Sequence, residues 1–226
     1  LGNGWPIDGL LDRYSACRFH GLNLSMLQDI TEWNPFDVLL ERDSSREARP
    51  DLVFLTEQAL VPVVGVVLVH KQKEYSAKVL HEEANTAIEQ LLAQREAAMV
   101  SIDTRLDLNT TGLRTAAEVE SLIAKMDLVV TTRLHGLVLA LKHGIPALAI
   151  DPVAGGAKIC RQAEVIGWPM VIKAEQISNT ALNEAFDYCL SDGAKQKARK
   201  CHAQAVRQMS SFDETFIAAL RCRNAS

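Results

Sequence analysis

Residues 61–69 read VPVVGVVLV, and this stretch decides the fold. A continuous run rich in β-branched residues is typical of a strand that is buried on both faces, as in a parallel sheet. The stretch lies within the longest apolar run of the chain, the ten residues from Leu60 to Val69. A membrane-spanning helix needs about 20 such residues, so the sequence predicts no transmembrane segment.

Working outward from this strand, short apolar runs alternate with helical patterns. We expect four further strands, at residues 99–102, 127–130, 147–150 and 170–173. Helices are expected around 88–92, from Thr115 onward, and at 134–143, 158–166, 178–190 and 195–223. Such alternation indicates parallel βαβ units, whose right-handed crossovers put helices on both faces of the sheet. We therefore predict a Rossmann-like α/β domain with a helical C-terminal tail.

Local signals mark several helix ends. Thr115 and Glu118 have the spacing of a capping box, and Gly144 and Gly167 follow two of the predicted helices. The first part of the chain has weak periodicity, with one expected strand at Phe36–Leu40. We expect a partial N-terminal segment or linker at 1–58, a Rossmann-like domain that binds the ligand at 59–190 and a helical tail at 191–226.

The composition is that of an ordinary globular protein, with 48% hydrophobic and 23% charged residues. It excludes disorder, collagen and a disulfide scaffold. A net charge of −4 provides no basic field to gather nucleic acid or an anionic membrane. Because the chain opens on Leu1 rather than Met, we expect a trimmed or partial product.

The five cysteines are scattered and never spaced C-x-x-C, which favours reduced thiols and a cytoplasmic protein. The alternative is a zinc site, suggested only by Cys201 and His202. Adjacent residues do not readily supply two ligands of one tetrahedron, so no metal is expected.

In an open parallel sheet, ligands bind beyond the carboxyl ends of the strands. This rule selects four stretches, at residues 70–73, 103–105, 131–135 and 151–158. They hold several cationic side chains, which favour an anionic ligand.

The stretch 131–135 is the most informative of the four. We expect Thr131 or Thr132 to cap the following helix, with Arg133 and His135 in its first turn. Cations in the first turn interact unfavourably with the helix dipole, so helix stability does not explain them. A bound anion would explain them, because the free amides at the helix start favour negative charge. Arg133 would grip phosphate or carboxylate, and His135 could transfer a proton. The alternative is that Arg133 pairs with a structural acid and His135 caps a carbonyl. If Arg133 is a ligand-binding residue, Arg133→Ala should abolish ligand binding and leave the fold intact.

The other stretches carry weaker signals. Asp151 to Lys158 contains two glycines and could form an amide-lined turn with Lys158 facing an anion, or a plain strand-to-helix turn. His70 and Lys71 follow the first strand, where a solvated turn is the default expectation. No role is assigned to the other histidines, among them His81.

Residues 129–152 read VVTTRLHGLVLALKHGIPALAIDP, and Lys158 follows. This string resembles the polysaccharide pyruvyl transferases, whose C-terminal domain has Arg-Leu-His opening a helix, a Gly-x-Pro stop, a strand, then Asp-Pro and a Lys. Residues 41–45 (ERDSS) and 50–55 (PDLVFL) are similar to the segment that links the two halves of such enzymes. The sequence departs from the family where Ile150 replaces a Tyr and where His70 and Lys71 stand in place of an Arg.

The resemblance implies a glycosyltransferase-B-like build, of which this chain would hold one half with an incomplete N-terminal half. It implies transfer of pyruvyl from phosphoenolpyruvate to a sugar diol of a bacterial exopolysaccharide or its precursor, with no separate cofactor. Arg133 would hold donor phosphate or carboxylate, His135 would be the acid or base, and Lys158 would neutralise charge. Further substrate contacts are expected from Thr132, Asp151, His70 and Lys71.

Two other functions remain open from the sequence alone. One is a nucleotide-sugar glycosyltransferase of the same fold, and the other is a non-catalytic remnant that binds a glycan or anion. The expected partners are a small anionic donor and a glycan acceptor, without nucleic acid, and self-association stays open.

Overall fold

The computed structural model describes residues 8–69, 80–153 and 157–223. The chain divides into two compact units, Leu1–Leu60 and Val61–Ser226, which are described separately below. His70 and Lys71, predicted as substrate contacts, lie outside the described residues.

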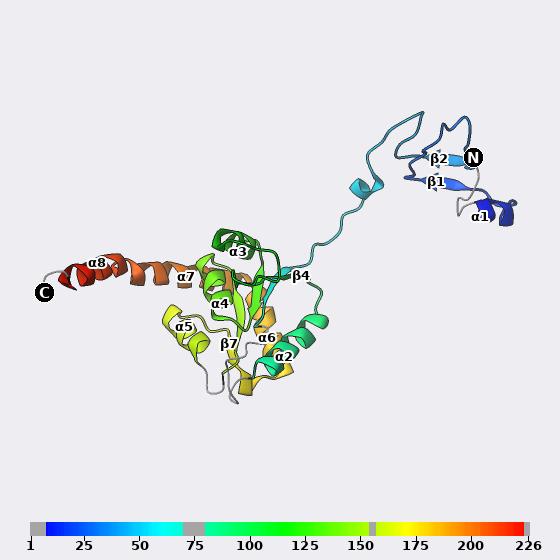
Figure 1. Cartoon of the computed structure of the whole chain (residues 1–226). Helices are drawn as coiled ribbons and strands as arrows, with labels where there is room; N and C mark the ends of the chain where they lie inside the picture. Colours follow the sequence, from blue (N-terminus) through cyan, green and yellow to red (C-terminus); the bar gives the residue numbers. More distant parts are fainter. Residues whose placement is uncertain (1–7, 70–79, 154–156, 224–226) are drawn as a thin grey trace. The chain divides into compact units, whose positions relative to one another are not determined.

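The second unit is built on a five-stranded parallel sheet with the strand order β4-β3-β5-β6-β7 (Figure 1). The strands are β3 (Val63–Val67), β4 (Ala98–Ser101), β5 (Leu128–Thr131), β6 (Ala147–Asp151) and β7 (Val171–Lys173). All residues of the two central strands β5 and β6 are buried, as expected for strands covered on both faces. The predicted Rossmann-like parallel sheet is confirmed.

Helices cover both faces of this sheet. The helices of this unit are α2 (His81–Ala93), α3 (Ala116–Ile123), α4 (Leu134–Lys142), α5 (Lys158–Ile166), α6 (Asn179–Leu190), α7 (Asp192–Met209) and α8 (Phe212–Arg223), with a short 3-10 helix η2 (Ala174–Gln176). Helix α8 extends away from the sheet, and its described side chains are exposed (Figure 1). Helix α4 contacts α3, α5 and α7, whereas α2 contacts α6, which separates the two layers (Figure 1). Within the described ranges, no helix combines the length and the apolar character needed to cross a bilayer.

Capping fixes several helix ends where the sequence predicts them. Thr115 and Glu118 form the expected capping box at the start of α3. Gly167 ends α5 with a φ of 78°, a left-handed conformation that glycine adopts without strain.

The single helix expected at 195–223 is wrong. Two helices, α7 and α8, occupy this region and are separated at Ser210 and Ser211. Helix α7 also begins earlier than expected, because the Ser191 hydroxyl accepts a hydrogen bond from the Ala194 amide and caps it. At the break, the Ser210 hydroxyl donates to the Arg207 carbonyl oxygen, a local bond that competes with helix continuation.

Helix α4 packs unusually close to strand β5. A Cβ atom built on Gly136 would lie 2.2 Å from Oγ1 of Thr131 and 3.1 Å from Cβ of Val67. A side chain at position 136 is therefore excluded unless the helix moves away from the sheet. Because Gly136 has no side chain, the start of α4 can pack directly against the ends of β3 and β5.

The first unit contains α1 (Asp8–Arg13), β1 (His20–Leu22), β2 (Val38–Leu40) and a 3-10 helix η1 (Leu52–Leu55). Strand β2 lies within the predicted strand 36–40 and pairs in parallel with β1, which the sequence analysis did not predict.

A buried carboxylate organises the segment after β2. Glu41 is 1% exposed, and its two oxygens accept hydrogen bonds from the guanidinium of Arg46 at 3.0 and 2.8 Å. The Ser44 hydroxyl donates to it at 2.9 Å, and Arg49 adds a second cation. The hydrogen bonds from Arg46, helped by a backbone amide, lower the pKa of Glu41 to about 2.

We expect Gly136→Ala to destabilise the second unit by about 1–3 kcal/mol, because the added methyl group overlaps Thr131. The matched control is Gly193→Ala in α7, where the nearest atom to the added Cβ is 3.7 Å away. That change should leave the stability unaltered or raise it by up to about 1 kcal/mol. Thermal unfolding of both variants checks this, and equal melting temperatures would contradict the close packing.

We expect the first unit to lose stability as the pH falls from about 4.5 to about 2. The folded pKa of Glu41 lies below its ordinary value, so its contribution is complete above pH 4.5 and disappears as the carboxylate is protonated. Hydrogen exchange across residues 36–51 measures this loss of protection. Glu41→Gln should flatten the dependence in that window, whereas Glu47→Gln, at a side chain that is 46% exposed, should preserve it.

Candidate functional site

The carboxyl edge of the sheet contains a topological switch point. The crossover through α2 leads from β3 to β4 on one side, and the crossover through α4 leads from β5 to β6 on the other. The chain therefore diverges between the neighbouring strands β3 and β5, where open α/β sheets bind their ligands. Of the four stretches selected from the sequence, the described parts of three (103–105, 131–135 and 151–158) follow β4, β5 and β6 at this edge.

Two threonine hydroxyls tie the ends of β3 and β5 together. Thr131 donates to the Val67 carbonyl oxygen at 2.8 Å and accepts from the Arg133 amide at 2.9 Å. Thr132 accepts from the Val69 amide at 3.0 Å and donates to Oδ1 of Asn85 in α2 at 3.2 Å. Both threonines are buried, so Thr132, predicted as a substrate contact, positions the edge through bonds it already makes.

The prediction that Thr131 or Thr132 caps α4 is wrong, as is the placement of Arg133 in the first turn. The helix begins at Leu134, and Arg133 itself is the N-cap residue, with extended backbone angles and no side-chain cap. Because the Thr131 hydroxyl is bonded to the Val67 carbonyl and the Arg133 amide, it does not reach the helix amides. The first free amides of α4 therefore follow Arg133 directly.

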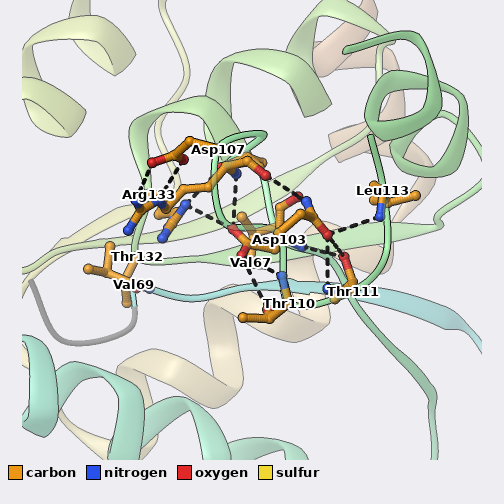
Figure 2. Close-up of polar contacts among 12 residues, drawn as sticks. Val67, Val69, Asp103, Asp107, Thr110, Thr111, Leu113, Thr132 and Arg133 are labelled. Carbon is orange, nitrogen blue, oxygen red and sulfur yellow. Dashed lines mark hydrogen bonds and ion pairs between the residues drawn. The ribbon is translucent and has the colours of Figure 1, made fainter. Parts of the chain in front are cut away.

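The side chain of Arg133 is 10% exposed and extends toward the loop after β4. Its Nη1 lies 3.1 Å from Oδ1 of Asp103, which is 3% exposed, and 3.3 Å from Oγ1 of Thr104 (Figure 2). Asp103 also accepts hydrogen bonds from the Arg105 amide and from the amide and hydroxyl of Thr110. A structural acid for Arg133, one of the two alternatives raised by the sequence, is thus present.

Burial and neighbouring charges balance differently in the pKa values of Asp103 and Arg133. Burial raises the pKa of Asp103, but the hydrogen bonds from Arg105 and Thr110 and the charge of Arg133 outweigh it and lower that pKa overall. For Arg133 the balance is reversed, since burial lowers its pKa more than Asp103 restores it. The charge of Arg133 is therefore incompletely compensated, and its Nε is buried without a hydrogen-bond partner among the described residues. An additional anion would stabilise it.

His135 lies in the first turn of α4 and is exposed. Two residues separate it from Arg133 along the chain, but the two side chains differ in surroundings. The side chain of Arg133 is largely buried against Asp103, whereas His135 is exposed to solvent.

Asp151 and Lys158 take different positions at the end of β6. Asp151 is 1% exposed, and its carboxylate accepts the amides of Val153, Ala157 and Cys160 at 3.2, 2.7 and 3.0 Å. It thereby accepts amides at the start of α5, which accounts for an acidic residue at this cationic edge. Lys158 is the first residue of α5 and is exposed.

His81 belongs to this edge although the sequence analysis assigned it no role. It is the first residue of α2, and the preceding Leu80 amide donates to the Pro152 carbonyl oxygen after β6 at 2.8 Å. Burial lowers the pKa of His81, and so does the charge of Arg133, while Asp151 opposes them. The rule that ligands bind beyond the carboxyl ends of the strands, called the strand-end rule below, did not select His81. This residue stands more than ten residues after β3 in the sequence, and only the fold places it at the edge.

The chemical character of the site is that of an anion-binding edge. Arg133, His135, His81 and Lys158 bring cationic or protonatable groups to the ends of β3, β5 and β6, near the start of helices α2, α4 and α5. Among the described residues, no group of three histidines, cysteines or carboxylates is arranged to hold a metal ion. Cys201 is buried, with its thiol directed at the Gly167 carbonyl oxygen.

Comparison with known families finds one family model that matches part of the chain. The model of the polysaccharide pyruvyl transferase family matches residues 43–152, just under half of the chain. The resemblance read from the sequence is confirmed over this range, which contains Arg133, His135 and Asp151 and ends before Lys158. No curated protein matches the chain.

Two solved glycosyltransferases are similar in structure to a limited extent. The glycotransferase of kitacinnamycin superposes with a TM-score of 0.42 at 14% identity, covering 66% of this chain and 40% of that one. The spinosyn forosaminyltransferase gives 0.42 at 12% identity, covering 82% and 52%. This chain therefore spans about half or less of the length of these structures.

We expect Arg133→Ala to lower both the stability and the affinity for anions. The buried pair with Asp103 changes the expectation that the fold is unaffected, because the substitution leaves a 3% exposed carboxylate without its cation. A loss of about 2–4 kcal/mol in unfolding free energy is expected, less than the largest values for broken buried pairs because Asp103 keeps its other hydrogen bonds.

The matched control is Arg161→Ala, at an exposed arginine of α5, which should stay within about 0.5 kcal/mol of wild type. Urea unfolding of the two variants provides the comparison. Equal stability of both would show that the Arg133–Asp103 pair does not support the edge.

Proposed function

We propose that the protein transfers a pyruvyl group from phosphoenolpyruvate to two hydroxyls of a sugar in a polysaccharide or its precursor. The product is a cyclic pyruvate ketal, and inorganic phosphate is released. The observation that carries this proposal is Arg133 at the switch point, next to the start of α4, whose side chain is 10% exposed and whose Nε has no hydrogen-bond partner among the described residues. The family match over residues 43–152 supports the same reaction.

The bond changes define what the site must do. One sugar hydroxyl adds to C2 of the donor, and C3 gains a proton to become a methyl group. The second hydroxyl then displaces phosphate from C2, and its proton leaves with the phosphate. The reaction therefore needs a cationic pocket for the donor and at least one group that moves protons between the hydroxyls, C3 and the leaving group.

The residues of this chain divide between these tasks. Arg133 binds the donor phosphate or carboxylate through the guanidinium nitrogens not used by Asp103, and the first amides of α4 contribute further donors. His135, exposed in the first turn, transfers the proton. Lys158 offsets negative charge from the start of α5. His70 and Lys71 are proposed as further donor contacts, while Thr132 and Asp151 hold the edge in shape.

The experiment is a phosphate-release assay with phosphoenolpyruvate and a panel of glycans that carry free 1,3-diols. We expect phosphate to appear in equal amount with a pyruvate ketal on one acceptor class, and phosphoenolpyruvate to raise the melting temperature. A rise in melting temperature with nucleotide-sugars, and none with phosphoenolpyruvate, would replace this proposal with a nucleotide-sugar glycosyltransferase. Binding of phosphoenolpyruvate without turnover on any acceptor would indicate a binding remnant.

We expect His135→Gln to lower turnover by about 10²–10⁴-fold, the usual contribution of a positioned acid or base. Donor affinity should change much less, because proton transfer contributes in the transition state rather than in ground-state binding. Steady-state kinetics and donor titration of the same variant separate the two quantities. Turnover near the wild-type rate would make His135 a non-catalytic residue of the helix start.

A further inference from the structure

Two buried nitrogens at the carboxyl edge of the sheet make no hydrogen bond to any residue that the structure describes. They are Nδ1 of His81 and Nε of Arg133. Buried polar side-chain atoms are nearly always bonded, so each exception requires an explanation. Both residues lie at the same edge, His81 at the start of α2 and Arg133 at the N-cap of α4.

Burial of the ring and the charge of Arg133 outweigh the charge of Asp151 and lower the pKa of His81 in the unliganded protein. Arg133 approaches from the end of β5 and disfavours a second positive charge, as does burial of the ring. Asp151, at the end of β6, acts in the opposite direction but has its oxygens bonded to three amides. On its own helix, Glu82 and Glu83 follow His81 in the first turn and are exposed.

An anion beside Arg133 would change this balance. It would supply an acceptor for both unpartnered nitrogens and would cancel the repulsion that Arg133 exerts on a protonated imidazole. The free amides at the starts of α2 and α4 favour negative charge at the same edge. The two buried nitrogens and the starts of α2 and α4 thus all favour an anion at this edge, and they lie on both sides of the switch point.

We propose that His81 is a further substrate-contacting residue, which binds an oxyanion of the donor together with Arg133 and takes up a proton when that anion arrives. This inference rests on the proposed function in taking the donor to be a small phosphate- and carboxylate-bearing anion. It adds a second wall to the donor site, contributed by α2, opposite the wall formed by α4.

The sign of the pH dependence follows from proton uptake. The bound state holds one proton more than the free state between the pKa of free His81 and its higher pKa in the complex. Donor affinity therefore rises as the pH falls through this window and is lost as the pH rises. We expect the pKa of the His81 imidazole to increase by about one pH unit or more on binding, which corresponds to about tenfold in affinity.

The direct test is to titrate the histidine ring signals by NMR with and without saturating phosphoenolpyruvate, with His81 assigned from its absence in His81→Asn. An increase in the pKa of His81 supports the inference, and an unchanged pKa overturns it. Calorimetry of phosphoenolpyruvate binding in two buffers of different ionisation enthalpy then counts the protons taken up.

The variants separate hydrogen bonding from protonation. His81→Asn keeps a donor near the position of Nδ1 but does not protonate, so it should bind phosphoenolpyruvate about tenfold more weakly and without proton uptake. His81→Ala should bind more weakly still. His143→Asn is the matched control, at the C-cap of α4, where His143 pairs with Glu120 away from the carboxyl edge, and its binding should equal that of wild type.

The outcomes distinguish this inference from the proposed function. If the wild-type protein binds phosphoenolpyruvate and His81→Asn shows the same affinity and proton uptake, the role of His81 is overturned and the donor assignment stands. If the wild type binds inorganic phosphate in a His81-dependent manner but not phosphoenolpyruvate, the donor assignment fails and the anion contact stands. If neither anion binds, both fail.

Discussion

The candidate site depends on the close approach of α4 to β5. Gly136 has no side chain, and this lets the first turn of the helix rest on Thr131 and Val67. The Thr131 hydroxyl then bonds to the Val67 carbonyl and to the Arg133 amide, so one buried group fixes two strands and the N-cap residue. The position of Arg133, and with it the direction of the first free amides of α4, follows from this packing.

A second constraint is that the carboxylates at the carboxyl edge of the sheet compensate the positive charges there only in part. Asp103 occupies one nitrogen of Arg133, and Asp151 accepts hydrogen bonds from backbone amides at the start of α5. The carboxylates therefore build the walls of the site without neutralising it. A helix start beside a largely buried guanidinium that has unused donors is an arrangement that favours a small anion.

The sequence was sufficient for the elements whose signals are local. The β-branched run at 61–69, the capping box of Thr115 and the glycine after Ile166 each reflect nearby residues, and β3, α3 and α5 appear where these predicted them. The strand β1 was missed, because it has three residues and its partner lies in another segment. The capping of α4 was misjudged, because the Thr131 hydroxyl bonds to Val67, more than sixty residues earlier in the chain.

The site itself was predictable only where it follows a strand directly. Arg133 and His135 stand just after β5, so the strand-end rule found them. Asp103 was placed at the edge by the same rule, but its pairing with Arg133 depends on the neighbouring positions of β3, β4 and β5 in the sheet. His81 was overlooked because only the return of the chain from β3 brings the start of α2 to the edge.

The parallel order of the sheet also determines when it can assemble. Strand β3 lies between β4 and β5, and its first residue, Val63, donates its amide to the Asp127 carboxylate. During synthesis the valines of β3 leave the ribosome long before residue 131. The edge of β3 that pairs with β5 therefore stays unpaired until β5 has been made. Pairing between distant segments is slow, and exposed apolar strands aggregate readily. Strand β3, which lies between β4 and β5 in the finished fold, is therefore an exposed apolar segment until β5 has been made.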